Sequence, residues 1–268
     1  MSKRALVVDN DFFFVEFLTE LLEDRGYEVA KAYDGKEGIS KLEGGSFDLI
    51  FVDLIMPKID GRQFIEFVRR RYPDATFPII TMSEALIEQL DNIKEIGADY
   101  YLAKGPMETM TEHVSHLIDR VKKQPFPGQE AATFLESGKL YPRQVTGELM
   151  EKVNFQRAII ESIGIGIMVI DRDARIMSSN SLALKIMNRS LEEVLNRPIT
   201  SVFPLREKAR LVMTLKEIIS NRTLRKLVFT ATVNAQEIRI IVSALKVNGK
   251  IAGWIITMED SDQWVEQA

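Results

Sequence analysis

Residues 48–61 read DLIFVDLIMPKIDG, and this stretch decides the fold of the first half of the chain. Leu49–Val52 is a continuous apolar run, which is typical of a strand buried on both faces. Asp53 follows at once, and Pro57 and Gly61 punctuate the loop before the next helix. Ligands of parallel sheets bind outside the carboxyl ends of the strands, so this aspartate is a candidate site residue.

The strand–helix alternation extends through the first 123 residues. Strands are expected at Ala5–Val8, Tyr27–Ala32, Leu49–Val52, Pro78–Met82 and Tyr100–Leu102. The apolar spacing predicts helices between them, one with Phe13, Phe14 and Phe17 on its apolar face and one over Leu86–Ile93. Five such repeats predict an α/β fold with a doubly wound, five-stranded parallel sheet and helices on both faces.

Residues 124–154 are expected to form a linker and a connector helix. Prolines and glycines interrupt residues 124–143, and helical spacing returns from Val145 to Ile163. The four-three alternation of a short coiled coil is followed by Leu149, Val153, Gln156, Ile160 and Ile163. This pattern fits a dimer seam and a helix that packs within its own domain equally well.

Residues 155–268 are expected to form an α+β domain on an antiparallel sheet. Two short strands flank the turn Asp171–Ala174, and Asn180 is placed to cap a helix over 181–188. Further helices are expected at Leu191–Leu195 and Lys208–Ser220, and further strands at Leu227–Val233, Ile238–Leu245 and Ile251–Met258. Asn234-Ala235 and Asn248-Gly249 are the hairpin turns, of which the second is a strong signal.

Composition excludes several classes of site. The 268 residues include no Cys and only two His, which removes disulfides, thiolate metal sites and cysteine nucleophiles. The N-terminus is unlike a signal peptide, and no run of about 18 apolar residues spans a membrane, so a cytoplasmic protein is expected. Residues 1–124 have a net charge of −7 and residues 125–268 one of +3, which is too weak and too scattered to predict nucleic-acid binding.

Polar side chains follow four of the five expected parallel strands. Asp9, Asn10 and Asp11 follow the first, Asp53 the third, Ser83 ends the fourth and Lys104 follows the fifth. Because these strand ends meet in one crevice, clustered carboxylates there favour a hard cation such as Mg²⁺. A metal and an ammonium beside a carboxylate suit phosphoryl transfer, with the central aspartate as the attacking oxygen.

The segments LVVDND, DLIFVDLIMPKIDG, PIITMS and GADYYLAKGP resemble the signature blocks of the receiver domain of two-component response regulators, over residues 1–123. The resemblance implies a flavodoxin-like architecture for this sheet. It also implies that Asp53 is the phosphoacceptor and that Lys104 pairs with the phosphate. Ser83 and Tyr101 match the hydroxyl and aromatic switch residues. The implied Mg²⁺ ligands are Asp9, Asn10, Asp53 and the carbonyl of Ile55.

Three positions depart from the pattern of that family. Asn10 stands in place of the second acid, so one negative charge is lost and the affinity for metal should fall. Asp11, one residue on, is a candidate to compensate for it. Glu84 replaces the usual small residue after the hydroxyl, and Gly105 replaces the usual proline after the lysine.

Residues 159–204, IIESIGIGIMVIDRDARIMSSNSLALKIMNRSLEEVLNRPITSVFP, are similar to the opening of a PAS domain, and the likeness extends over Phe155–Asp262. Ala174 and Asn196 stand where that family often has glycine. The lack of His beyond His116 and of any Cys excludes histidine-ligated haem and a cysteine-linked flavin, while a non-covalent ligand stays open. Four residues could line a pocket or form plain core: Ile186, Met187, Met213 and Phe229.

Together these features predict a signalling protein and not an enzyme beyond its own phosphorylation and dephosphorylation. Its expected partners are a histidine kinase or phosphotransfer protein and a second copy bound through the connector helix or the PAS-like domain; no nucleic acid or membrane is expected. The phosphorylation switch would be relayed to the PAS-like domain. The alternatives are a phosphorylation-independent receiver that acts as a scaffold, and a PAS ligand sensor that controls the receiver.

Overall fold

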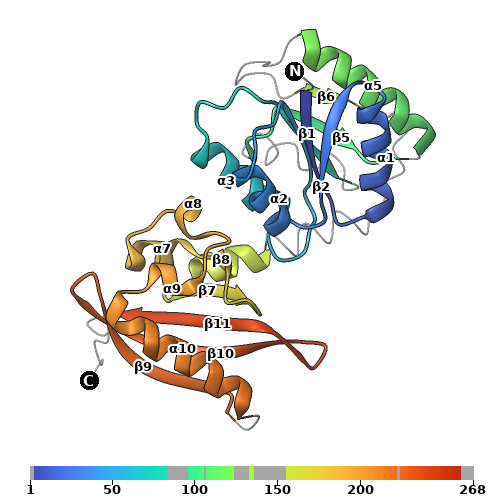
Figure 1. Ribbon diagram of the computed structural model, residues 1–268. Coiled ribbons are helices and arrows are strands. Elements are labelled where there is room, and N and C mark those ends of the chain that lie inside the picture. The colour runs from blue at the N-terminus through green and yellow to red at the C-terminus, as the bar shows by residue number, and fades with distance from the viewer. Residues whose placement is uncertain are drawn as a thin grey trace. The chain divides into compact units, whose positions relative to one another are not determined.

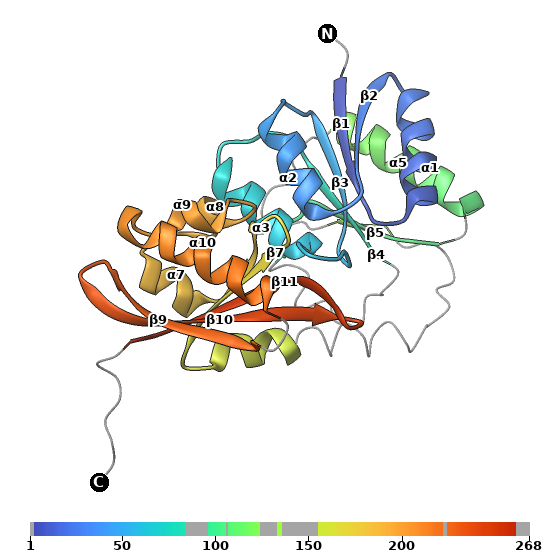
Figure 2. The ribbon, with the colours of Figure 1, turned by 60° about the horizontal axis from the view of Figure 1, so that its bottom comes forward.

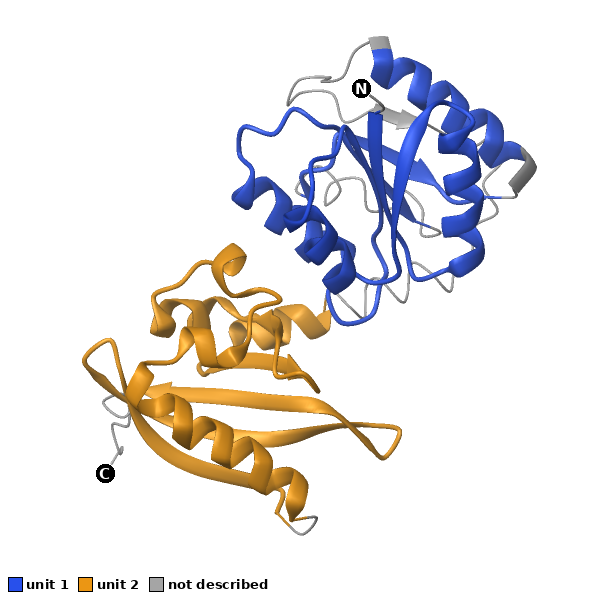
Figure 3. Ribbon diagram, viewed as in Figure 1, with its two compact units in different colours: residues 1–153 blue, residues 154–268 orange. Residues whose placement is uncertain are grey.

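Two sheets, each with its own core, organise the chain (Figures 1 and 3). The computed structural model describes residues 3–83, 96–105, 107–123, 133–135, 155–221 and 224–260. Its chain divides into two units, residues 1–153 and 154–268. Within the described ranges, no helix combines the length and apolar character needed to cross a membrane.

The sheet of the first unit is parallel throughout. Its strands are β1 (Lys3–Val8), β2 (Tyr27–Ala32), β3 (Leu49–Asp53), β4 (Ile79–Ser83), β5 (Tyr100–Ala103) and β6 (Thr133–Leu135), in the order β2-β1-β3-β4-β5-β6. The predicted five-stranded parallel sheet is therefore confirmed. The sixth strand lies in the segment expected to be a linker, because a run of three residues is too short to show a strand period.

Helices cover both faces of this sheet, with α1 and α5 on one face and α2 and α3 on the other (Figures 1 and 2). They span α1 (Phe12–Glu23), α2 (Gly35–Glu43), α3 (Gly61–Arg71) and α5 (Met107–Lys123). Asp11, Asp34 and Asp60 cap the N-termini of α1, α2 and α3 with their side chains. The helix expected over Leu86–Ile93 lies outside the described residues.

From Ala5 to Val8 the interior strand β1 is buried on both faces, as its apolar run predicts. Ala5 and Val7 belong to the core cluster shared with α1 and α5. On the other face, Val8 packs so closely against α2 that a Cβ on Gly38 would lie 3.0 Å from its Cγ1. These two apolar layers fix the strand ends that position the site.

The sheet of the second unit is antiparallel. Its strands are β7 (Gly166–Asp171), β8 (Ile176–Ser179), β9 (Lys226–Val233), β10 (Gln236–Val247) and β11 (Lys250–Asp260), in the order β8-β7-β11-β10-β9. Both predicted hairpin turns are confirmed, since Asn234, Ala235, Asn248 and Gly249 all have positive φ, as a turn of this type requires.

Ala174 and Asn196 also have a left-handed backbone, with φ of 57° and 58°. These are the two positions where the resembling family often has glycine, and glycine adopts this conformation without steric cost. Asn tolerates it better than other residues with a Cβ, whereas Ala174 carries a strain of about 1 kcal/mol.

The helices of the second unit are a helix over 155–162, α7 (Ser181–Met187), α8 (Leu191–Val194), α9 (Ile199–Val202) and α10 (Leu205–Ser220). Figure 2 shows α7 to α10 on one face of the sheet. The single-turn α9 was not expected. The expected start of α10 at Lys208 is wrong by three residues, because the exposed Leu205 does not join the apolar pattern. Of the expected connector helix, residues 145–154 lie outside the described part.

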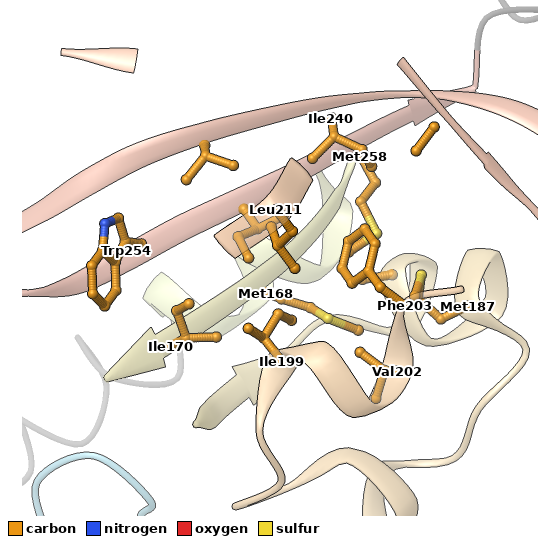
Figure 4. Packing of buried hydrophobic residues seen from close by; sticks show 14 of the residues in the cluster. Met168, Ile170, Met187, Ile199, Val202, Phe203, Leu211, Ile240, Trp254 and Met258 are labelled. Carbon is orange, nitrogen blue, oxygen red and sulfur yellow. The ribbon is translucent and has the colours of Figure 1, made fainter. Parts of the chain in front are cut away.

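The core of this unit lies between its sheet and α7 to α10 (Figure 4). Two of the candidate pocket residues, Met187 and Phe229, are core members, and Ile186 packs against the core. Met213 is 70% exposed on α10, so the expectation that it lines a pocket or the core is wrong.

Candidate functional site

Three neighbouring strands bring the acid, hydroxyl and amine of the first unit to one edge. Asp53 and Ser83 are the last residues of β3 and β4, and Lys104 follows the last residue of β5. The backbone N–H of Lys104 donates to the carbonyl of Ser83 at 2.9 Å. Residues that are far apart in the sequence therefore lie side by side at the carboxyl edge.

The ammonium of Lys104 lies between two buried carboxylates. Its Nζ is 2.6 Å from Oδ2 of Asp9 and 3.2 Å from Oδ1 of Asp53, and its side chain is only 10% exposed. A single positive charge thus faces two negative charges, in a place where little water reaches any of them.

Burial is the main influence on the pKa values of both carboxylates. Burial raises the pKa of Asp53 to about 7, and the Asp9 carboxylate adds to the rise, although Lys104 opposes it. Burial also raises the pKa of Asp9. Burial disfavours the charged form of Lys104, but Asp53 and Asp9 outweigh that effect and raise its pKa. The site is therefore arranged to gain from additional positive charge.

The residues after β1 have separate roles. Asp9 is fully buried, whereas Asn10 and Asp11 are exposed. Oδ1 of Asp11 accepts the backbone N–H groups of Phe13 and Phe14 at 2.9 and 3.3 Å, which caps α1. Because this carboxylate already caps the helix, the geometry speaks against the expectation that Asp11 replaces the missing acid at Asn10 as a metal ligand.

The residues at this edge fit a magnesium ion, although they form a sparse ligand set. In the described part of the chain, no three His, Cys, Asp or Glu side chains gather as a metal site. Mg²⁺ usually keeps several waters, however, and one or two carboxylates suffice for it. Oδ2 of Asp9 is buried and contacts the Lys104 ammonium at 2.6 Å, and a carboxylate oxygen that accepts one donor still has a second lone pair for a cation.

Of the other expected site residues, Ser83 ends β4 and Tyr101 lies within β5, where the groups that act on its hydroxyl are Ala98, Asp99 and Arg69. Ser83 and Tyr101 are both buried, with 7% exposure each, and burial raises the pKa of Tyr101 to about 12. The backbone N–H of Ile55 hydrogen-bonds to the Asp53 carboxylate and lowers its pKa. Glu84, the bulky residue after Ser83, lies outside the described residues.

Gly61 holds the loop after Asp53 in place by its lack of a side chain. A Cβ there would lie 2.1 Å from the backbone oxygen of Asp53 and 2.8 Å from Cα of Leu54. We expect Gly61→Ala to displace the backbone at Asp53, at a cost of about 3 kcal/mol in the free energy of unfolding. Urea denaturation measures this cost. Gly44→Ala is the control, since its Cβ meets nothing closer than 3.5 Å. Equal stability of the two variants would contradict the prediction.

One contact at the site involves a residue that the sequence did not single out. The Lys104 Nζ lies 4.7 Å from the ring centroid of Phe14, on α1. In the sequence, Phe14 is one of several apolar residues at helical spacing, and this spacing predicts only that it faces the core. Its position three residues after the Asp11 cap was the sole hint that it lies close to the strand ends.

Comparison with known proteins agrees with this architecture. Residues 5–115 match the model of the response regulator receiver domain, and residues 154–260 match that of the PAS fold. The alkaline phosphatase synthesis transcriptional regulatory protein PhoP of Bacillus subtilis is 38% identical over 39% of this chain and 43% of its own. The regulatory protein VanRc of Enterococcus gallinarum is 32% identical over 46% of this chain and 50% of its own. The chain thus spans about half the length of these curated relatives.

Solved structures are also similar to part of the chain. One is the response regulator TrrA from Thermotoga maritima, in complex with Mg²⁺ and BeF. It is 30% identical, and the match covers 45% of this chain and 97% of that one, with a TM-score of 0.39.

Proposed function

The chain carries a response regulator receiver domain at residues 5–115 and a PAS domain at residues 154–260, and on this premise we propose that Asp53 accepts a phosphoryl group from a histidine kinase or phosphotransfer protein. The proposal rests on the position of the Lys104 ammonium, which lies within 3.2 Å of both the Asp53 and the Asp9 carboxylates. A histidine-bound phosphoryl group is the class of donor that this chemistry fits.

In the proposed reaction an Oδ atom of Asp53 attacks phosphorus, and the bond from phosphorus to the donor atom breaks. The electron pair of that bond leaves with the donor, and the product is an acyl phosphate on Asp53. Lys104 neutralises the charge on the phosphoryl oxygens as the group is transferred. Ser83, the last residue of the neighbouring strand, would donate its hydroxyl hydrogen to the acyl phosphate.

Asp9 and Asp53, with the amide oxygen of Asn10 and the carbonyl of Ile55, are the residues that would hold Mg²⁺. When bound, the ion supplies positive charge that offsets the phosphoryl oxygens and the carboxylates together. The exposed, uncharged Asn10 gives less attraction for the ion than a second acid would give.

Incubation with Mg²⁺ and acetyl phosphate tests this function. We expect the wild type to gain the mass of one phosphoryl group and Asp53→Asn to gain none, because an amide oxygen is not a competent nucleophile. Asp24→Asn, the same change at the exposed C-terminus of α1, is the control and should behave like the wild type. A wild type that gains no mass would instead support a scaffold whose partner reads a fixed surface.

We further propose that the state of Asp53 is relayed to the PAS domain through the connector. Ser83 and the buried Tyr101 are the residues whose rearrangement would change the surface near β4 and β5. At the far end of the connector, the helix over 155–162 opens the PAS domain and is hydrogen-bonded to the start of α7. Asn180 Nδ2 donates to the carbonyl of Ile160 at 3.0 Å, and Glu161 accepts the N–H of Ser181 at 3.0 Å. A movement of this helix would therefore act directly on the start of α7.

Self-association through this helix is part of the same proposal. Phe155, Ile159, Ile160 and Ile163 are 67%, 42%, 38% and 37% exposed, an apolar face that a second copy could cover. Analytical ultracentrifugation should find a dimer for the wild type and a monomer for the double variant Phe155→Ser/Ile159→Ser. Met213→Ser removes an equally exposed apolar side chain from α10 and should leave the dimer intact. Equal sedimentation of all three proteins would count against the helix over 155–162 as a dimer seam.

A further inference from the structure

We propose that Phe14 is a positioning residue for the reaction at Asp53, because the face of its ring holds the Lys104 ammonium between the two carboxylates. The effect on the reaction rests on the proposed function. The contact between ring and ammonium does not, and it can be measured separately.

The geometry is that of a cation–π contact. Lys104 Nζ is 4.7 Å from the centroid of the Phe14 ring, well inside the distance of about 6 Å at which such pairs attract. Phe14 is only 6% exposed and the Lys104 side chain 10%, so both groups are largely removed from water. A desolvated ammonium gains more from an aromatic face than an exposed one.

The ring itself is held from two sides. At the start of α1, the backbone N–H of Phe14 donates a hydrogen bond to the Asp11 carboxylate at 3.3 Å. The N–H of Asp11 in turn donates to Oδ1 of Asp9 at 2.9 Å. On the core side, the ring lies 5.9 Å from that of Phe17 and belongs to the apolar cluster between the sheet, α1 and α5. Because Asp9 also contacts Lys104, the four residues Asp9, Asp11, Phe14 and Lys104 form a closed series of contacts.

A lysine needs such a third contact more than a rigid side chain does. Its ammonium is a compact charge at the end of a flexible four-carbon stem. Two carboxylate oxygens alone leave it free to swing about the line that joins them. The ring restricts that motion without occupying any carboxylate oxygen, and its attraction is not lost when the ammonium shifts by a few tenths of an ångström. The ammonium can therefore follow the charge that develops on a transferred group.

Fluorinated phenylalanines placed at position 14 test the effect on the reaction. Fluorine weakens the negative potential of the ring face with little change of volume, so the rate of phosphoryl uptake from acetyl phosphate should fall with each added fluorine, to about one tenth for the most fluorinated ring. The same series at Phe17 is the matched control and should leave the rate unchanged. A flat series at position 14, or an equal fall at position 17, would overturn the inference.

NMR of the Lys104 ε-methylene group tests the contact without any phosphoryl donor. Its protons should resonate upfield in the wild type, because of the ring current, and return to ordinary positions in Phe14→Leu. The Lys104→Arg variant has no ε-methylene group at this position, so the resonance that disappears in its spectrum is the one that belongs to Lys104. The absence of an upfield shift in the wild type overturns the inference whatever Asp53 does. An upfield shift in a protein that takes up no phosphoryl group supports the contact and rejects the proposed function.

Discussion

Replacement of Lys104 by methionine should slow phosphoryl uptake by Asp53 about 100- to 1,000-fold, the usual cost of removing one preorganised group that stabilises transition-state charge. The side chain of methionine fills a similar volume but brings no charge. The ammonium it replaces lies 2.6 Å from Asp9 and 3.2 Å from Asp53. Stopped incubations with acetyl phosphate and mass spectrometry of the intact protein measure the rate.

A control must separate this loss from misfolding, since two buried carboxylates without a counter-ion oppose folding. Lys104→Met in the Asp53→Asn background removes one of the two negative charges, and this double variant should unfold at a higher urea concentration than Lys104→Met alone. Lys41→Met removes a lysine of α2 whose ion pair with Glu37 is surface-exposed, and it should leave the rate unchanged. Uptake by Lys104→Met within threefold of the wild type would contradict the assigned role.

Asn180→Ala should lower the free energy of unfolding of the PAS domain by about 4 kcal/mol, because one buried side chain makes four hydrogen bonds there. Its Nδ2 donates to the carbonyls of Ile160 and Ile165 at 3.0 and 2.9 Å, and its Oδ1 accepts the N–H groups of Ile167 and Ala183 at 2.8 and 3.0 Å. The residue is 1% exposed, so water does not replace the lost partners.

Tryptophan fluorescence during urea denaturation measures this loss, because both Trp residues of the chain lie beyond residue 154. Ser181→Ala, next along the chain and exposed, should change the stability by less than about 0.5 kcal/mol. Asn180→Asp keeps the two accepted bonds and loses the two donated ones, so it should release the helix over 155–162. Hydrogen exchange of that helix should then rise before that of β7. A stability of Asn180→Ala within 1 kcal/mol of the wild type would show that the network contributes little.

The expectations that held were those that depend on local pattern. Apolar runs such as Leu49–Val52 located the strands, because a strand covered by helices on both faces must be apolar throughout. Once the strands were located, the rule that their carboxyl ends meet at one edge was enough to place Asp53, Ser83 and Lys104 together. The hairpin turn at Asn248-Gly249 followed from its requirement for positive φ.

Two expectations failed because they depended on which side of a helix meets its neighbours. Apolar spacing placed Phe13 and Phe14 on the same buried face, yet Phe13 is 75% exposed and Phe14 is 6% exposed. The start of α10 was missed because Leu205 precedes the buried face of the helix. The Lys104–Phe14 contact joins the loop after β5 to α1, and no local pattern links two segments so far apart in sequence.

The strand β6 covers the open side of β5, which would otherwise be an edge strand of the parallel sheet. Tyr100, Tyr101 and Leu102 of β5 are paired with residues 133–135, so the backbone donors and acceptors on that side of β5 are already occupied. An open strand at a sheet boundary is a template on which other chains can add strands and aggregate. By supplying the neighbour from its own downstream segment, this chain shields the strand that carries Tyr101 from intermolecular strand addition.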